Sequence, residues 1–403
     1  MYDMLRKKSG YYAKEVVEFA SELVKIPSPS LSEARVAAHV EAKMTELGYD
    51  KVVTDTFGNV VGLMLGREAG PTLLLNCHMD TADVPSAKIS SGEILDNRLS
   101  GQGASDCKSG LAAQIYSGDL LKRSMLPLKG NLVVAATVAE ENGGSSGVRG
   151  LMEKTLPSLG LKPDFAVLGE PTDLGLYYGH DGWVTIDVTI ESDNQFQVND
   201  TARAIFDNLQ DATTTTSNDS YQKVMVREPY FETMGDIRQA VVVLDRRIKA
   251  AENADEVLGQ VQRQVSLIAQ TLGNATVSVM VKKEKTTLYT GTTTTVKRVS
   301  HAWSIDPFHQ LMERSRHALS AAGCVVRPGK WALNRLGMGT AGGVFADTYN
   351  VPAIGYGPGS ESAAHSTDEW VDIRKIREAL FGTTVIAHSL IGVPVFGWTS
   401  DDI

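Results

Sequence analysis

The chain has 403 residues, of which 42% are hydrophobic and 22% charged, a composition that excludes intrinsic disorder and supplies core for two or three domains. Its formal net charge of −9 and its scattered Lys and Arg residues exclude the basic face that a nucleic-acid partner requires. Three cysteines at unrelated spacings and the lack of a long apolar run favour a cytoplasmic protein with no membrane partner.

The N-terminal part predicts a sheet that is covered by helices. Apolar positions at helical spacing predict a helix over 11–26, and Ser30 with Glu33 indicates a capping box that opens a second helix through Leu47. Apolar, β-rich runs predict strands at 51–55, 60–65, 72–77, 131–138 and 164–168, with helices at 109–124 and 146–155. Strands that alternate with helices imply a largely parallel, covered α/β sheet.

The middle of the chain predicts a second, smaller sheet of βαββαβ order, which is ferredoxin-like with helices on one side. Its expected elements are a strand at 183–190, a helix at 201–211, strands at 223–228 and 240–245, a helix at 254–271 and a strand at 276–282. Threonine-rich pieces at 213–216 and 292–295 are expected to be loops.

Afterwards the α/β pattern resumes, with a helix expected at 307–322, a strand at 351–356 and a helix at 373–390. The α/β pattern is therefore interrupted by the smaller sheet. We predict a catalytic domain of residues 1–181 and 297–403 and an inserted domain of residues 182–296.

Ionisable residues stand at the ends of predicted strands, before a helix or after a glycine-rich loop: His78, Asp80, Asp106, Glu140, Glu141, Glu170 and His365. Ligands of α/β sheets bind beyond the carboxyl ends of the strands. Imidazole and carboxylate suit zinc, with manganese or cobalt as alternatives, and the surplus of carboxylates allows two divalent metal ions. Each residue alone also fits a structural role in a loop or cap, so the prediction of a metal centre depends on their joint placement.

The segments that carry these residues resemble the motifs of a known family. They are His78-Met79-Asp80, the loop around Asp106, Glu140-Glu141-Asn142-Gly143-Gly144, Gly169-Glu170-Pro171-Thr172 and the run from Gly357 to His365. In this order they are similar to the dinuclear metallopeptidase and deacylase family, which includes acetylornithine deacetylase, succinyl-diaminopimelate desuccinylase, aminoacylase and glutamate carboxypeptidase. The run from Lys330-Trp331 onward looks most like the hydrolases linked to selenium metabolism.

The resemblance implies a role for each residue. The ligand sets are His78, Asp106 and Glu170 for one ion, and Asp106, Glu141 and His365 for the other. Glu140 would be the general base and acid, and Asp80 would orient His78 through its other ring nitrogen. The family also implies that the inserted domain is a lid and the surface of a homodimer.

The residues expected to contact a small-molecule substrate depart from the family pattern. Asn194 stands where relatives carry a lid histidine that binds the substrate carbonyl oxygen, and asparagine cannot carry positive charge. Arg335 and Thr340 lie in a segment that relatives use near a substrate carboxylate. His180 is a candidate hinge or substrate contact at the entry to the inserted domain.

The sequence thus predicts a metal-dependent hydrolase in which activated water cleaves an amide C–N bond of a small N-acyl amino acid or peptide-like substrate. One alternative, motivated by Asn194, is a hydrolytic deaminase of an aromatic amine or cleavage of another non-peptide C–N bond. Another is a metal-binding protein without activity. Glu140 argues against this last alternative, because pure binding has no need of a free base.

Overall fold

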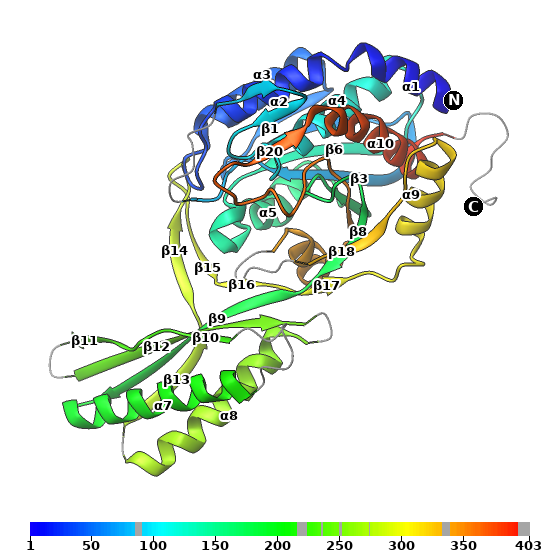
Figure 1. Ribbon diagram of the computed structural model, residues 1–403. Coiled ribbons are helices and arrows are strands. Elements are labelled where there is room, and N and C mark those ends of the chain that lie inside the picture. Colours follow the sequence, from blue (N-terminus) through cyan, green and yellow to red (C-terminus); the bar gives the residue numbers. More distant parts are fainter. Residues whose placement is uncertain are drawn as a thin grey trace.

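A computed structural model of the protein describes residues 1–84, 91–215, 224–234, 237–249, 252–273, 275–332 and 339–393. Its main feature is a nine-stranded sheet of order β1-β2-β6-β3-β7-β19-β8-β17, with β18 paired to β8 (Figure 1). The strands are β1 Lys51–Thr54, β2 Val60–Met64, β3 Glu68–His78, β6 Lys129–Thr137, β7 Phe165–Leu168, β8 Leu176–His180, β17 Trp303–Ser304, β18 Pro328–Trp331 and β19 Ala353–Gly355.

The centre of this sheet is parallel and its flanks are not. Strands β6, β3, β7 and β19 run parallel to one another, which confirms the predicted α/β fold around a parallel core. The flanks are antiparallel, because β1 pairs antiparallel with β2, β2 with β6 and β8 with β19. A short turn joins β1 to β2, and such a connection can link only antiparallel neighbours.

Helices cover both faces of the nine-stranded sheet. They are α1 Tyr2–Tyr11, α2 Glu15–Lys25, α3 Ala34–Glu46, α4 Lys108–Arg123, α5 Ser146–Gly150, α6 Leu156–Ser158, α9 Gln310–Ala321 and α10 Ile373–Ile391. Alternate residues of β3 enter opposite cores: Leu73 and Leu75 pack towards α2, α4 and α10, and Leu74 packs on the other face with residues of α5 and α6. No helix in the described part of the chain is long and apolar enough to span a bilayer.

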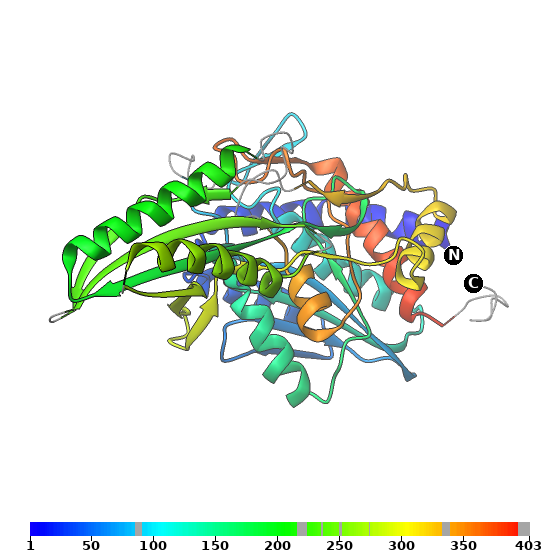
Figure 2. The same ribbon diagram turned by 90° about the horizontal axis from the view of Figure 1, so that it is seen from below.

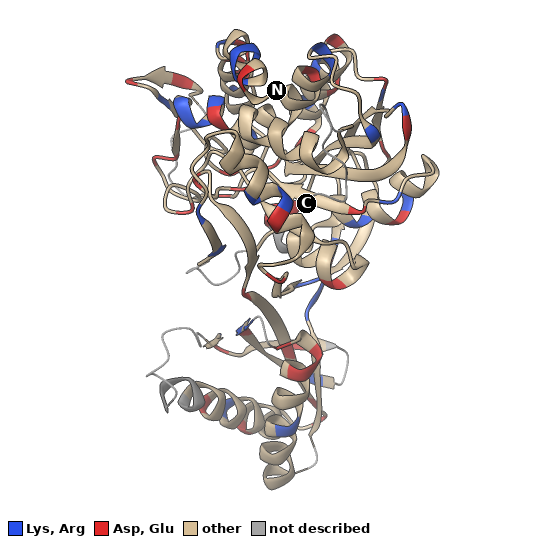
Figure 3. Cartoon of the chain, turned by 90° about the vertical axis from the view of Figure 1, so that its right-hand side faces the viewer, with Lys and Arg blue, Asp and Glu red and all other residues tan. Residues whose placement is uncertain are grey.

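Charged residues of both signs share the outer helices and loops around this sheet, as the colouring in Figure 3 shows. Arg6 of α1 and Glu378 of α10 form one such pair, with 3.2 Å between guanidinium and carboxylate atoms.

The predicted capping box before α3 is wrong. The helix begins at Ala34, and the residue before it, Glu33, makes no side-chain cap bond to it. Instead the Ser30 hydroxyl donates to the Asp80 carboxylate. Glu33 Oε1 accepts from the amide of Ala139 at 3.0 Å. Both residues thus serve the loops beyond β3 and β6, because the buried amides there have no partner in the sheet.

A second sheet and two helices lie to one side of the first sheet (Figures 1 and 2). Their elements are β9 Gly182–Ser192, α7 Gln195–Thr215, β10 Val224–Val226, β11 Tyr230–Met234, β12 Ile237–Ile248, α8 Ala254–Leu272, β13 Thr276–Val281 and β16 Val299–Ser300. The strand order is β10-β12-β9-β13, with β11 also on β12 and β16 on β9. The prediction of a loop at 213–216 is wrong for its first three residues, because α7 continues to Thr215. Residue 216 lies outside the described residues.

The loop expected at 292–295 is also wrong. Residues Thr293–Lys297 form β15, which pairs with β14, Lys283–Thr287. Composition alone suggested a loop, but threonine is β-branched and favours strands. The tip of this hairpin packs on the first sheet's domain: Leu288 is 2% exposed within its main core, and the Tyr289 hydroxyl donates to the carbonyl of Gly58 at 3.1 Å.

Two further strands pair with a third near the C-terminal helix. They are β4 Glu93–Leu95 and β5 Arg98–Ser100, and β20 Trp370–Asp372 joins β5. This small sheet brings residues just before α10 against the segment that precedes α4.

We predict that Leu288→Ala destabilises the protein although its position is in a surface hairpin. Removing a buried leucine from a packed core costs about 2–5 kcal/mol. The thermal midpoint should fall by several degrees, as measured by differential scanning calorimetry. The matched control is Thr295→Ala, at an exposed position of β15, which should leave the midpoint nearly unchanged. Equal midpoints for the two variants would contradict the packing of the hairpin tip.

Candidate metal centre

His78 is the last residue of β3 and is 3% exposed. Its Nδ1 lies 2.9 Å from the main-chain oxygen of Asp80. Because a carbonyl oxygen can only accept, Nδ1 carries a proton, and Nε2 is the ring nitrogen that faces the neighbouring carboxylates. This Nε2 lies 3.2 Å from Asp106 Oδ1 and 3.9 Å from Glu170 Oε2. The ring is therefore held with Nε2 towards two carboxylates.

Asp106 stands between two imidazoles. Its Oδ1 faces Nε2 of His78, and its Oδ2 lies 3.3 Å from Nε2 of His365. The residue directly precedes Cys107 and α4, whose first turn closes this segment. Burial favours the neutral acid, but the two histidines outweigh it and lower the pKa of Asp106. A carboxylate with one oxygen towards each histidine has the arrangement of a bridging ligand.

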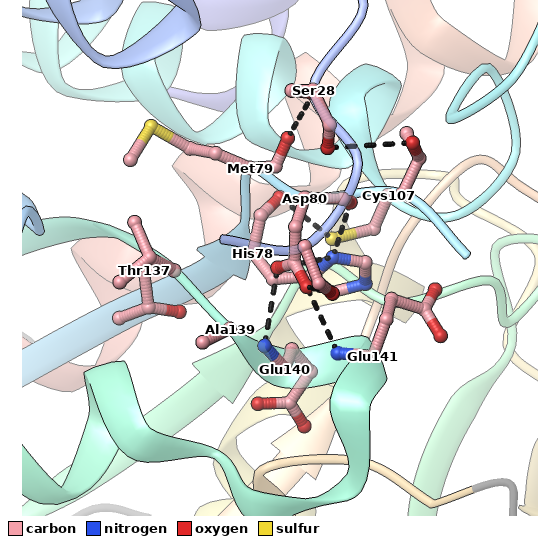
Figure 4. Close-up of polar contacts among 12 residues, drawn as sticks. Ser28, His78, Met79, Asp80, Cys107, Thr137, Ala139, Glu140 and Glu141 are labelled. Atoms are coloured by element: carbon pink, nitrogen blue, oxygen red, sulfur yellow. Dashed lines mark hydrogen bonds and ion pairs between the residues drawn. The ribbon is translucent and has the colours of Figure 1, made fainter. Parts of the chain in front are cut away.

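Glu140 and Glu141 lie in a tight π-helical turn after β6, Glu140–Gly144, that is flanked by the left-handed residues Ala139 and Ser145. Asp80 holds this turn, as Figure 4 shows: its carboxylate accepts from the amides of Glu140 at 3.2 Å and Glu141 at 3.0 Å. Asp80 was predicted to orient His78, and its carboxylate lies 3.5 Å from Nδ1 of the ring. The shorter contact to this nitrogen, at 2.9 Å, is made by the main-chain oxygen of Asp80. The Asp80 carboxylate fixes the backbone of the turn through these two amides.

The two glutamates of this turn differ in their surroundings. Glu141 Oε1 lies 2.9 Å from His365 Nε2. Glu140 is 8% exposed, and its Oε2 has no hydrogen-bond partner among the described residues. Burial raises the pKa of Glu140 to about 7. A carboxyl group with such a pKa can both accept and release a proton near neutral pH.

Glu170 and His365 complete the arrangement. Glu170 follows β7 and is 4% exposed, and burial raises its pKa. His365 lies in the loop between β19 and β20 with a left-handed backbone, φ 53°. The structure thus gathers ligand-type atoms into two groups within 4.8 Å: His78, Asp106, Cys107 and Glu170, and Asp106, Glu141 and His365.

These groups fit divalent ions. Two ligand atoms about 2.1 Å from one tetrahedral ion are about 3.4 Å apart, close to the distances from Asp106 to either histidine. None of the described residues that line the cleft is Lys or Arg, whereas five carboxylates line it: Asp106, Glu140, Glu141, Glu170 and Glu361. Cys107, which the sequence did not indicate, is a poor ligand here, because burial raises the pKa of its thiol and favours the protonated form.

The cleft in front of these groups encloses about 660 Å³, including space open to solvent. Of the residues predicted to contact substrate, Thr340 lines it. His180 does not: it is buried behind Thr340, its Nε2 accepts from the Thr340 amide at 3.0 Å, and burial lowers its pKa to about 4. Asn194 is exposed and accepts from the amide of Phe196 at the start of α7. Arg335 lies outside the described residues.

Other lining residues were missed by reasoning from sequence. They are Ser145, Trp183, Val299, Ser300, His301, Trp331, Val344 and Glu361. Half of them, Trp183, Val299, Ser300 and His301, lie at the two crossings between the sheets, where β9 begins and where β16 ends. Trp183 is 3% exposed and is also part of the cleft wall. No spacing signal marks such residues, because only the return of the chain brings 299–301 opposite Trp183.

Comparison with known proteins gives a consistent result. The sequence model of peptidase family M20/M25/M40 matches residues 74–390. The chain is 26% identical to an uncharacterised protein of Escherichia coli, YgeY, over 91% of this chain and 92% of the relative. It is 26% identical to a [LysW]-lysine hydrolase of Deinococcus radiodurans, over 94% and 98%.

Among solved structures, one similar fold is the YXEP protein of Bacillus subtilis, described as a dinuclear metal binding peptidase from the M20 family. The TM-score is 0.68 at 14% identity, covering 94% of this chain and 98% of that one.

We predict that the purified protein holds two divalent ions per chain and that Asp106→Ala holds fewer than one. Loss of the carboxylate between the two histidines removes a ligand from both groups. Elemental analysis by mass spectrometry after dialysis measures the content. Asp50→Ala, at an exposed residue beside β1, is the control and should keep both ions. Two ions retained by Asp106→Ala would exclude the bridging arrangement.

Proposed function

This chain is a member of peptidase family M20/M25/M40, and we propose that it is a metal-dependent hydrolase that cleaves an amide C–N bond in a small N-acyl amino acid or peptide-like substrate. The observation that carries the proposal is the buried carboxyl of Glu140, with an oxygen that has no hydrogen-bond partner among the described residues, beside two groups of metal-ligand atoms. A binding protein would have no use for such a base.

We assign the ligands as two sets that share Asp106. His78, Asp106 and Glu170 would hold one ion, and Asp106, Glu141 and His365 the other. The histidine and carboxylate donors suit zinc first, with manganese or cobalt as alternatives. When bound, the ions lower the pKa of a coordinated water and polarise the substrate carbonyl.

The chain's own residues do the rest of the chemistry. Glu140 accepts the proton of the attacking water and returns it to the leaving nitrogen, as its pKa of about 7 allows. Asp80 keeps Glu140 and Glu141 in place through their amides. Trp183 and Trp331, with Val299 and Val344, form an apolar wall that excludes water from the reacting bond.

We propose that the two sheets belong to two domains with different roles. Residues 1–181 and 297–403 would form the catalytic domain and residues 182–296 the lid. Support comes from the cleft, because Trp183 begins the second sheet and lines the same space as His78. The hairpin tip around Leu288 packs on the catalytic domain and would limit how far the lid moves.

We propose that the second sheet also forms a homodimer. Strand β13 is an end of that sheet and pairs only with β9 in the described part of the chain. It exposes Met280 by 59%, and exposed edge strands pair readily with another chain. The protein should sediment at twice the mass of one chain, and Met280→Asp should weaken the dimer. Phe308→Asp, at an exposed residue before α9, should not. A monomeric parent chain would refute the proposal.

The reaction is tested with Glu140→Gln and a panel of N-acyl amino acids and dipeptides. The variant should keep both ions, while kcat falls roughly 10²- to 10⁴-fold and KM changes little, because only proton transfer is lost. The control is Glu46→Gln, at an exposed residue of α3.

The products identify the reaction class. Release of a carboxylic acid together with an amino compound supports amide hydrolysis. Release of ammonia alone from an aromatic amine would favour the deaminase alternative, and bound ions with no turnover of either substrate class would favour a binding protein.

A further inference from the structure

Glu369 is a buried carboxylate that makes no contact with the cleft. It lies just before β20 and is 3% exposed, and it is not among the residues that line the cleft. Its Oε1 accepts from the amides of Ser105 at 2.8 Å and Asp106 at 2.9 Å. Its Oε2 accepts from the amide of Gly103 at 2.8 Å. One side chain therefore satisfies three amides of the segment that ends in Asp106.

These three amides have no other hydrogen-bond partner among the described residues. The segment lies between β5 and α4 and is irregular, so neither a strand nor the helix supplies acceptors for it. Buried amides without acceptors are costly, so a carboxylate that accepts three of them fixes the backbone firmly. The main chain of Glu369 adds a fourth bond, because its oxygen accepts from the amide of Gly101 at 2.9 Å.

We infer that Glu369 is a positioning residue that sets where the Asp106 carboxylate stands between His78 and His365. The inference rests on the proposed function, in which Asp106 bridges two ions. A ligand bound about 2 Å from each ion tolerates little displacement, so a shift of the 103–106 backbone would weaken both sites at once.

The geometry also explains why the residue is an acid of this length. A glutamine would keep one acceptor oxygen but would turn an NH₂ group towards an amide N–H. Either the pair at Ser105 and Asp106 or the bond at Gly103 would then be lost. A second anchor remains in every variant, because the Ser105 hydroxyl donates to the carbonyl of Ser360 at 3.0 Å and accepts from its amide at 2.7 Å. The loop should shift rather than unfold.

The test combines hydrogen exchange with metal affinity in the full chain. In Glu369→Gln, exchange of a peptide that covers 101–107 should speed up about tenfold or more, and affinity for cobalt(II) should fall roughly 10- to 100-fold, as for other residues that orient ligands. The visible spectrum of the bound cobalt should change with the ligand geometry. Glu369→Asp keeps the charge and should recover part of both effects.

Asp372→Asn is the matched control. Asp372 is the last residue of β20, the short strand that follows Glu369, and its side chain caps α10 by accepting from the amide of Arg374 at 2.8 Å, without a bond to the described 101–106 segment. The Asp372→Asn variant should be less stable than the parent chain, but hydrogen exchange at 101–107 and cobalt affinity should be unchanged.

Each outcome either supports or contradicts the positioning role of Glu369. Unchanged exchange in Glu369→Gln, or faster exchange with the parent's cobalt affinity and spectrum, would overturn the positioning role. If Glu369→Gln does not fold, the same two comparisons are made with Glu369→Asp. A parent chain that binds fewer than two cobalt ions would overturn the proposed function itself, and the positioning role with it.

Discussion

Buried negative charge at one edge of the nine-stranded sheet is the constraint on which the rest of the structure depends. Asp106, Glu140, Glu141 and Glu170 line one cleft, and no Lys or Arg lines it in the part of the chain that the structure describes. Carboxylates removed from water and placed side by side are unfavourable unless cations or protons offset them. Divalent ions are cations that the imidazole and carboxylate donors of this site fit. Glu140, Glu141 and Glu170 follow the parallel strands β6 and β7, whose carboxyl ends share an edge with the end of β3 at His78.

The loops that carry the ligands are held by a second group of acids, which act through backbone amides. Glu33 accepts from Ala139, Asp80 from the two glutamates of the turn, and Glu369 from the segment before α4. The loops need such partners because they leave regular structure: Ala139 and His365 both have left-handed backbones, with φ 54° and 53°. Conformations of this kind persist only where the surroundings determine them. The positions of the proposed ligand residues therefore depend on side chains that are not themselves ligands.

The sequence allowed the ligand-bearing positions to be predicted, but not what holds them. His78 and Glu170 follow apolar strand runs, and the parallel order of those strands makes their convergence a physical expectation. No sequence pattern marks Glu369 in this way. Its carboxylate oxygens accept from main-chain amides, and these are the same whichever side chains the residues carry. Ser30 and Glu33 were assigned to a helix cap because their spacing matches one, but the amide of Ala139 and the acid of Asp80, distant in sequence, compete for them. The hairpin of β14 and β15 was missed for a related reason, because its burial against Gly58 is a tertiary effect.

Asn194 illustrates how the same residue can support two different arguments. From sequence it stood in the place of a charged lid histidine. In the structure its side-chain oxygen accepts from the amide of Phe196, so a helix cap accounts for asparagine at this position, where it is among the preferred residues. Within one chain Asn194 does not line the cleft, so the donors that we propose for a developing oxyanion are residues that do. The cleft offers the hydroxyls of Ser300 and Thr340, and Thr340 is fixed by the neutral ring of His180 through its amide. Rigid neutral donors stabilise negative charge by orientation rather than by charge, so substrate selection should reside where the chain crosses between its two sheets.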